Sequence, residues 1–409
     1  MSKELSAPKG MRLHIGFFGR RNVGKSSLIN ALTRQQTSIV SAQPGTTTDP
    51  VEKAMELLPL GPILLIDTAG IDDDQADLGA LRIKRTDDAI SRTDLALLVA
   101  EAGSWGRYED ELAERFRKLG KPFVVVLNKA DLCQGGDARQ CLPDAVREAA
   151  QIVLLSALNP EAGAELRQAL LDCAPASFWE SRPIVSDLLS ENGTAVLVVP
   201  IDKEAPKGRL ILPQVQTIRD LLDAGCCAVV TQTEQLAQTL DNLKTKPDLV
   251  ITDSQAFKRV AEIVPADIPL TSFSVLFARY KGDLATMLEG ARHLLNLDET
   301  ARILIAEACT HHPIAEDIGT VKIPRLLKAK LGEGITIEHA QGRDFPENLQ
   351  DYDLVIHCGG CTLNRRGMLH RLQACRESGV AVTNYGLAIA ALNGILERSV
   401  ASLRYGGAK

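Results

Sequence analysis

No apolar run in this sequence approaches the roughly 18 residues that a membrane-spanning helix needs. Residues 195–199, for example, form an apolar run that has the length of a strand and ends at Pro200. The first ten residues carry Lys3, Glu4 and Lys9 but no apolar stretch, so they predict no secretory signal. The chain also shows no internal repeat and no low-complexity tract. We therefore expect a globular protein of the cytoplasm with no membrane segment.

The chain lacks the excess of positive charge that is typical of dedicated nucleic-acid-binding proteins. It has 46 lysines and arginines against 52 aspartates and glutamates, which gives a net charge of −6. Nucleic acid is therefore not expected as a partner. At about 150 residues per domain, the 409 residues predict two or three domains.

A disulfide framework is not indicated either. The nine cysteines are an odd number in a long chain, and such thiols fit a reducing compartment, where grouped cysteines more often bind metal. Cys358 and Cys361 have the C-x-x-C spacing. Six others lack partners at ligand spacing, and we interpret them as core or surface residues: Cys133, Cys141, Cys173, Cys226, Cys227 and Cys375.

Short apolar runs that alternate with amphipathic stretches predict an α/β fold for residues 1–175. Such runs are typical of buried strands, and stretches such as 25–33 and 108–119 have helical periodicity. The alternation predicts a mostly parallel sheet with helices on both faces. The expected strands are 13–18, 63–66, 95–99, 123–127 and 152–155.

Two smaller α/β domains are expected after a linker near residues 174–183. The central domain covers residues 180–268, and the C-terminal domain covers residues 269–409. Both repeat the β-then-α rhythm without a repeated motif. Their expected strands are 195–199, 228–231 and 249–251, followed by 302–306, 354–357 and 380–383.

Residues 19–26 match the pattern G-x-x-x-x-G-K-S/T between a predicted strand and a predicted helix. Glycines let backbone N–H groups surround phosphate oxygens at a helix N-terminus. Lys25 is expected to reach the β- and γ-phosphates as a catalytic residue, and Ser26 to bind Mg²⁺. The expected nucleotide-binding residues of this loop are Gly19, Asn22, Val23, Gly24, Lys25, Ser26 and Ser27.

Two further motifs follow predicted strands of the same domain. In Asp67-Thr68-Ala69-Gly70, the carboxylate of Asp67 can hold the metal ion through water, and the Gly70 N–H can sense the γ-phosphate as a catalytic group. In Asn128-Lys129-Ala130-Asp131, the carboxylate of Asp131 can accept hydrogen bonds from N1 and N2 of guanine.

Ser156 and Ala157, after another strand, are expected to support the base from behind. Four motifs in this order, each at the carboxyl end of a strand, indicate a GTPase. The sequence therefore predicts a P-loop GTPase domain with a mostly parallel sheet, followed by two smaller α/β domains.

In detail these motifs resemble the GTPases of the Era and tRNA-modifying kind. Residues 45–49, Gly-Thr-Thr-Thr-Asp, resemble their switch I, which implies that Thr47 completes the Mg²⁺ shell as a catalytic residue and that Thr46 also contacts the nucleotide site. Asn22 matches the asparagine that binds K⁺ in potassium-activated members. The remaining K⁺ contacts would be Ser41, Gln43 and Thr46.

Such a potassium ion would supply the positive charge that an arginine finger supplies elsewhere. Ile71, and not a water-orienting glutamine, follows Gly70. We therefore expect slow intrinsic hydrolysis of GTP.

Cysteine and histidine gather behind two predicted strands of the C-terminal domain. Cys309-Thr310-His311 follows the strand 302–306, and His357-Cys358-Gly359-Gly360-Cys361 ends the strand 354–357. The carboxyl edge of a parallel sheet is the usual place for ligands. From spacing alone these residues could hold Zn²⁺, hold an iron–sulfur cluster with a non-cysteine fourth ligand, or be unligated core cysteines.

A GTPase domain joined to this C-terminal pattern resembles the [FeFe]-hydrogenase maturation GTPases over essentially the whole chain. The resemblance implies that Cys309, Cys358 and Cys361 bind a [4Fe-4S] cluster. The fourth ligand is exchangeable in that family, and here His311, His357 or an acid such as Asp317 could take that position. It also implies that the central domain forms a homodimer.

The resemblance further implies a scaffold and carrier. Such a protein receives a transient di-iron precursor from two radical-SAM hydrogenase maturases and delivers it to the apo-[FeFe]-hydrogenase, with GTP, Mg²⁺ and K⁺ at the nucleotide site. GTP binding would reorder the switch segments and bias contacts with partner proteins.

Two other functions stay open. One is an RNA- or ribosome-related GTPase with a C-terminal structural zinc site, against which the acidic charge and the lack of a recognisable RNA-binding module count. The other is an enzyme acting on a small molecule at the cluster. We find no radical-SAM Cys-x-x-x-Cys-x-x-Cys triplet to support it.

Overall fold

The computed structural model divides the chain into two compact units, unit 1 (residues 1–181) and unit 2 (residues 182–409). Each is described by itself. The structure describes residues 9–34, 40–42, 51–68, 79–133, 137–175, 182–201, 210–308, 317–342, 345–346, 348–360 and 362–403.

The described part of unit 1 forms one seven-stranded sheet in the order β2-β3-β4-β1-β5-β6-β7. Strands β1, β4, β5, β6 and β7 are parallel, whereas β3 is antiparallel to both β2 and β4. The strands are β1 (Leu13–Phe18), β2 (Val40–Ala42), β3 (Val51–Leu57), β4 (Gly61–Asp67), β5 (Leu95–Glu101), β6 (Phe123–Asn128) and β7 (Gln151–Leu154).

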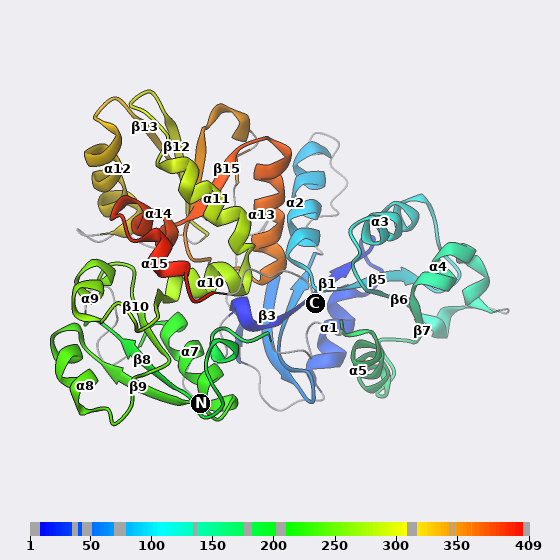
Figure 1. Ribbon diagram of the computed structural model, residues 1–409. Helices are drawn as coiled ribbons and strands as arrows, with labels where there is room; N and C mark the ends of the chain where they lie inside the picture. Colours follow the sequence, from blue (N-terminus) through cyan, green and yellow to red (C-terminus); the bar gives the residue numbers. More distant parts are fainter. Residues whose placement is uncertain are drawn as a thin grey trace. The chain divides into compact units, whose positions relative to one another are not determined.

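Helices cover both faces of this sheet (Figure 1). The side chains of α1 and α5 pack on one face with Leu97 and Val99, and those of α2, α3 and α4 pack on the other with Leu98 and Ala100. Burial on both faces explains why β5 and β6 are continuous apolar runs. The helices are α1 (Lys25–Arg34), α2 (Gly79–Arg92), α3 (Arg107–Lys118), α4 (Asp144–Ala149) and α5 (Ala162–Cys173).

Unit 2 contains two four-stranded parallel sheets among its described residues. The first has the order β11-β10-β8-β9 and the second β13-β12-β14-β15. The strands are β8 (Thr194–Val198), β9 (Cys227–Thr231), β10 (Leu249–Thr252), β11 (Leu270–Ser272), β12 (Arg302–Ala306), β13 (Thr336–Ala340), β14 (Leu354–His357) and β15 (Ala381–Asn384).

A continuous hydrophobic core joins these two sheets. It includes Leu197 and Ile251 of the first sheet, Ile305 and Val355 of the second, and Phe273 of α10. The boundary expected at residues 268/269 stays a prediction. The helices of this unit are α7 (Leu212–Asp223), α8 (Leu236–Asn242), α9 (Phe257–Ile263), α10 (Phe273–Lys281), α11 (Leu284–Leu294), α12 (Ile323–Leu331), α13 (Arg365–Glu377), α14 (Tyr385–Leu392) and α15 (Leu396–Val400).

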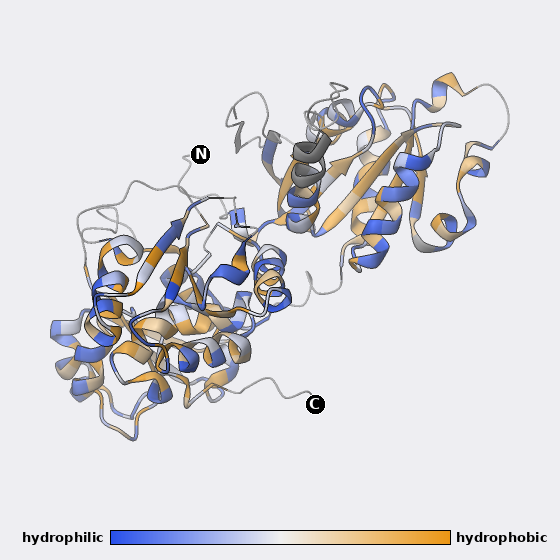
Figure 2. Ribbon diagram, turned by 90° about the horizontal axis from the view of Figure 1, so that it is seen from above, coloured by the Kyte–Doolittle hydropathy of each residue, from blue (hydrophilic) through white to orange (hydrophobic). Residues whose placement is uncertain are grey.

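The fold class predicted from the sequence is confirmed, as is each of its expected strands to within two residues at either end. Figure 2 shows these strands as mostly apolar ribbons, with polar residues distributed over the helices. Four strands were not predicted: β2, the antiparallel β3 (Val51–Leu57), β11 and the edge strand β13 (Thr336–Ala340). Each contains polar residues, so none of the four forms a continuous apolar run. Within the described ranges, no helix is both long and apolar enough to cross a membrane.

Candidate nucleotide and metal sites

The phosphate-binding loop follows β1 and depends on two glycines with positive φ. Gly19 has φ 141° and Gly24 has φ 98°. A Cβ atom on Gly19 would lie 2.1 Å from the carbonyl oxygen of Val99, and one on Gly24 would lie 2.2 Å from Nδ2 of Asn128. Larger residues would therefore both strain the backbone and separate the loop from its neighbours.

Lys25 and Ser26 lie at the start of α1, at the carboxyl end of β1. Lys25 is buried, and its Nζ donates hydrogen bonds to the carbonyls of Gly19 and, at 2.8 Å, Arg20. The hydroxyl of Ser26 donates to Oδ2 of Asp67 at 2.7 Å. Phe17 pairs with Asp67 across β1 and β4, so the sheet register brings the two proposed Mg²⁺ residues together.

Asn128 joins the phosphate loop to the predicted base-binding loop. Its Nδ2 donates to the carbonyl of Val23 at 2.7 Å, and its Oδ1 accepts from the N–H of Ala157 at 2.9 Å. The side chain is 2% exposed, so both amide groups are satisfied inside the protein. Asp131 is exposed in the short helix that follows β6. This geometry leaves its carboxylate accessible to a base.

The remaining residues of the nucleotide prediction are partly described. Val23 is buried, and Ser27 lies in the first turn of α1. Lys129, with φ 61°, pairs with Glu101 at 2.8 Å. Ser41 lies in β2. Residues outside the described ranges are Gln43, Thr46, Thr47 and Gly70.

Glu109 supports the phosphate loop and was missed by the sequence reasoning. Its side chain is 1% exposed and accepts from Nη2 of Arg20 at 2.6 Å and from the N–H of Gly106 at 3.1 Å. It therefore binds the loop to the N-terminus of α3, where the helix dipole also favours a negative charge. An acidic residue in a first helical turn is common, so the sequence carried no distinct signal.

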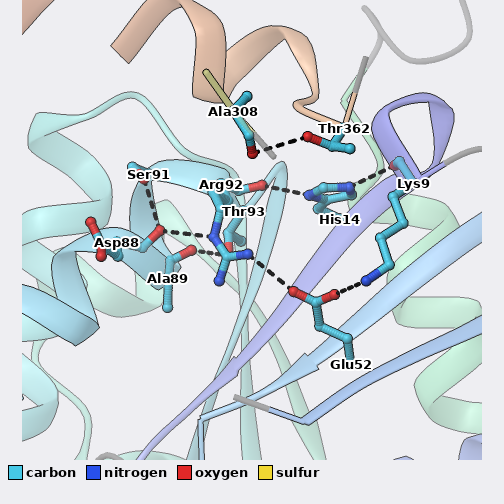
Figure 3. A network of polar contacts seen from close by, with 10 residues as sticks. All are labelled: Lys9, His14, Glu52, Asp88, Ala89, Ser91, Arg92, Thr93, Ala308 and Thr362. Atoms are coloured by element: carbon cyan, nitrogen blue, oxygen red, sulfur yellow. Dashed lines mark hydrogen bonds and ion pairs between the residues drawn. The ribbon is translucent and has the colours of Figure 1, made fainter. Parts of the chain in front are cut away.

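The amino edge of the same sheet holds a separate polar network (Figure 3). The ring of His14 contacts the carbonyls of Lys9 at 2.9 Å and Arg92 at 3.1 Å, and Glu52 pairs with the side chains of both. Burial lowers the pKa of His14, while Asp94 nearby opposes that shift. The network thus links residues 9–11, which precede β1, to the C-terminal end of α2 through hydrogen bonds and ion pairs.

In unit 2 the carboxyl ends of β12 and β14 meet around Cys358. Ala306 pairs with His357 across the two strands. The sulfur of Cys358 accepts from the N–H groups of Ala308 at 3.2 Å and Gly360 at 3.4 Å. The Thr362 hydroxyl also donates to the carbonyl of Ala308 at 3.2 Å (Figure 3).

Ala308 and Gly360 immediately precede Cys309 and Cys361 in the chain, and Cys309, Cys361 and His311 lie outside the described residues. The structure thus brings Ala308, Cys358 and Gly360 together. The described part of the chain contains no cluster of three metal-ligating side chains.

His357 is held by hydrogen bonds at both ring nitrogens. Nδ1 donates to the carbonyl of Cys358 at 2.7 Å, and Nε2 accepts from Nη1 of Arg371 at 2.9 Å. Complete burial, helped by the charge of Arg371, lowers the pKa of His357 to about 3. The neutral ring in this arrangement has no lone pair left for a metal, which disfavours it as the fourth ligand.

Two buried carboxylates lie near this edge. Oδ1 of Asp317 accepts from the N–H of Thr320 at 2.7 Å and caps the helical turn that follows. Glu307 is 3% exposed and accepts from the hydroxyl of Tyr385 at 2.9 Å and from Gln341 at 3.2 Å. Burial raises the pKa of Tyr385, and the nearby Cys358 and Glu307 add to this shift.

Family profiles match three successive parts of the chain. Residues 14–129 match the 50S ribosome-binding GTPase family. Residues 184–282 match the hydrogen maturase F dimerization domain, and residues 285–402 match the hydrogen maturase F tetramerization domain. The GTPase match covers the phosphate loop, Asp67 and Asn128.

Curated relatives match the N-terminal part. A tRNA modification GTPase MnmE of Desulfotalea psychrophila is 35% identical over 189 residues, which are 45% of this chain and 40% of that protein. A GTPase Der of Deinococcus deserti is 40% identical over 126 residues, 31% of this chain and 28% of that protein. The chain therefore spans about two fifths or less of the length of these relatives.

Comparison with solved structures also finds GTPases. Aquifex aeolicus Era bound to GDP and AlF4⁻ is 21% identical, with a TM-score of 0.33, over 54% of this chain and 93% of that one. The G domain of the T. maritima FeoB iron transporter is 24% identical, with a TM-score of 0.30, over 40% of this chain and 99% of that one. With a GTPase domain in unit 1 and both hydrogen maturase F domains in unit 2, this chain belongs to the hydrogen maturase F family.

Proposed function

We propose that the protein is a GTP-dependent scaffold that holds a [4Fe-4S] cluster and carries the di-iron precursor to the apo-[FeFe]-hydrogenase. The observation that carries this proposal is the convergence on Cys358. Its sulfur accepts two backbone hydrogen bonds, and the donors are the residues that precede Cys309 and Cys361.

The donor chemistry of this edge fits an iron–sulfur cluster. N–H groups aimed at a cysteine sulfur stabilise its thiolate form and the sulfur ligands of such clusters. Gly359 and Gly360 follow Cys358, and a Cβ on Gly359 would meet nothing within 4 Å, so the loop leaves room beside it. The residues that would hold the cluster are Cys309, Cys358 and Cys361. When bound, a cluster with one exchangeable ligand supplies an open iron site for the incoming precursor.

At the nucleotide site this chain's residues bind and orient GTP. We propose that Asp131 selects guanine, that Asn128 holds the two binding loops together, and that Ser26 and Thr47 hold Mg²⁺. Lys25 would leave its two loop carbonyls and donate to the β- and γ-phosphates, where negative charge develops during hydrolysis.

Asn22, which has a left-handed backbone conformation in the phosphate loop with φ 62°, would bind a stimulating K⁺. Gly70 and Thr47 would couple the γ-phosphate to the switch segments. Through these segments the nucleotide state would control contacts with the radical-SAM hydrogenase maturases and the hydrogenase.

Self-association is supported by the two matched family domains, which are named for dimerization and tetramerization. We propose that the homodimer forms across the face made by α7 and β9. There, Val215 and Leu222 on α7 and Val230 on the edge strand β9 are 48%, 60% and 47% exposed. A second copy would cover these apolar side chains and the unpaired strand edge.

The test is metal analysis combined with electron paramagnetic resonance after anaerobic reconstitution. The wild type should hold about four iron and four sulfide ions per chain, with a signal on reduction that is lost in Cys309→Ala. A colourless protein with one zinc ion per chain would contradict the proposal. It would favour an RNA- or ribosome-related GTPase with a structural zinc site.

A further inference from the structure

Lys281 is a buried cation for which no motif accounts. It is the last residue of α10, its side chain is 2% exposed, and its Nζ lies 5.9 Å from the ring centroid of Phe277. Lysine is almost never fully buried unless polar partners compensate the lost hydration. The partners given by the structure lie in the segment that follows β14, residues 358–363, which we call the cysteine loop.

The ammonium group of Lys281 holds both ends of one turn. It donates to the carbonyl of Gly360 at 3.0 Å and to the carbonyl of Leu363 at 3.0 Å. The same Gly360 carbonyl accepts from the N–H of Leu363 at 3.0 Å, which closes a turn of four residues. Cys361 follows Gly360 in the sequence, and the Gly360 carbonyl belongs to the peptide bond that joins these two residues.

Gly360 is closely packed at the start of this turn. Gly360 has φ 58°, and a Cβ there would lie 2.5 Å from Cε of Met368. The Gly360 N–H also donates to the Cys358 sulfur. A displacement of the Gly360 carbonyl would therefore alter the position of the residues on both sides of it.

This contact crosses the boundary between the two matched family domains. Lys281 lies within residues 184–282 and the cysteine loop within residues 285–402. A second cation connects the same two family domains from the other side: Arg365 of α13 donates to the carbonyls of Tyr280 at 3.2 Å and Gly282 at 2.7 Å. Arg365 thus links the C-terminal domain to the end of α10, but its bonds go to these carbonyls and not to Gly360.

We propose that Lys281 is a positioning residue of the iron–sulfur site: it fixes the turn that carries Cys361 and places a buried positive charge beside the cluster. This inference rests on the proposed function. A [4Fe-4S] core held by three thiolates has a net negative charge that grows on reduction, so a nearby buried cation stabilises the reduced form more than the oxidised form.

The test compares Lys281→Met, which removes charge and donors at similar volume, with Lys281→Arg and Lys281→Gln. Arg365→Met controls for the contact between the two elements, and Lys258→Met, at an exposed lysine of α9, controls for net charge. Each full-length variant is reconstituted anaerobically. Iron content, the midpoint potential of the cluster, the rate of iron release to a chelator, circular dichroism and GTP hydrolysis are measured.

We expect Lys281→Met to release iron at least tenfold faster and to shift the midpoint potential to more negative values. Lys281→Gln should shift the potential in the same direction, and Lys281→Arg should restore it in part. Arg365→Met should lower the melting temperature of unit 2 without the shift in potential. GTP hydrolysis should stay within twofold of wild type in every variant.

A wild-type protein that binds no iron–sulfur cluster would refute the proposed function, and this inference with it. A wild-type cluster combined with unchanged potential and iron release in Lys281→Met would refute the inference alone. If all three Lys281 variants fail to fold while Arg365→Met folds, the role of Lys281 is structural and the inference is also wrong.

Discussion

Two sheet edges can be compared: the edge of unit 1 that carries the phosphate loop (the nucleotide edge) and the edge of unit 2 that carries Cys358 (the cysteine edge). They share a geometry but are built from different groups. Both lie at the carboxyl ends of parallel strands, where the fold concentrates ligand sites. The nucleotide edge is shaped by glycines and backbone groups close together in sequence, such as Gly19 to Lys25. The cysteine edge is held by buried side chains from distant segments, among them Lys281 and Arg371.

This difference teaches which kind of site a sequence reveals. A loop that must present N–H groups to phosphate needs particular glycines at fixed spacing, so its function is visible as a motif. A cation that compensates a buried loop can come from any neighbouring element. Its position in the sequence is therefore not constrained by the site it serves.

The largest expected effect is the separate loss of each function: one variant loses GTP hydrolysis and keeps iron, and the other loses iron and keeps GTP hydrolysis. Lys25→Ala should reduce GTP hydrolysis by at least about 100-fold, because a charge-assisted contact to the phosphates is lost, while iron content stays unchanged. Cys358→Ala should lose most of the iron and keep GTP hydrolysis. Metal analysis and phosphate release on the two variants would show this, with the exposed Cys227→Ser as a control.

A more selective change concerns the base. Asp131→Asn should weaken GTP binding by at least about 100-fold, since two hydrogen bonds to a charged acceptor are worth about 1.5–3 kcal/mol each. The same variant should gain affinity for xanthosine triphosphate, whose ring presents the complementary groups. Fluorescent nucleotide titration measures both, and equal binding of GTP by variant and wild type would remove Asp131 from the site.

A smaller effect is expected behind the phosphate loop. Glu109→Gln should destabilise unit 1 by about 1–3 kcal/mol, because it replaces a buried charged acceptor of Arg20. It should also weaken nucleotide binding several-fold. The matched Glu111→Gln removes an exposed pair with Arg107 and should change stability by less than about 0.5 kcal/mol. Equal effects of the two would show that Glu109 does not support the loop.

The smallest effect is a pH dependence at the amino edge. The pKa of His14 is lower in the folded protein than its unfolded value of about 6.5. The stability from neutral His14 is therefore present above that pH. It falls as pH decreases toward the folded pKa, by at most about 1.4 kcal/mol per pH unit.

His14→Gln should flatten this dependence, and the exposed His293→Gln should not. Tryptophan fluorescence during urea unfolding reports on unit 1, because Trp105 packs against its hydrophobic core. An unchanged slope in His14→Gln would assign the pH dependence to other groups.

The periodicity of the sequence predicted the strands that form apolar runs, most of which are buried on both faces. It missed β2, β3, β11 and β13, each of which contains polar residues. The residues of the phosphate loop and Asn128 were also named from motifs, and the structure places them in contact. His357 was named as a possible ligand, but only the fold shows that its ring nitrogens bind Arg371 and the Cys358 carbonyl.

The sequence alone was thus enough to identify the local motifs: a strand, a glycine loop with a lysine for phosphate, and cysteines at metal-binding spacing. Only the tertiary structure showed which charged side chains support these motifs. Lys281 and Gly360 are 79 positions apart, and Arg20 and Glu109 are 89. The physical reason is that backbone conformation is set by neighbouring residues, whereas burial of a charge is set by whatever the fold packs around it.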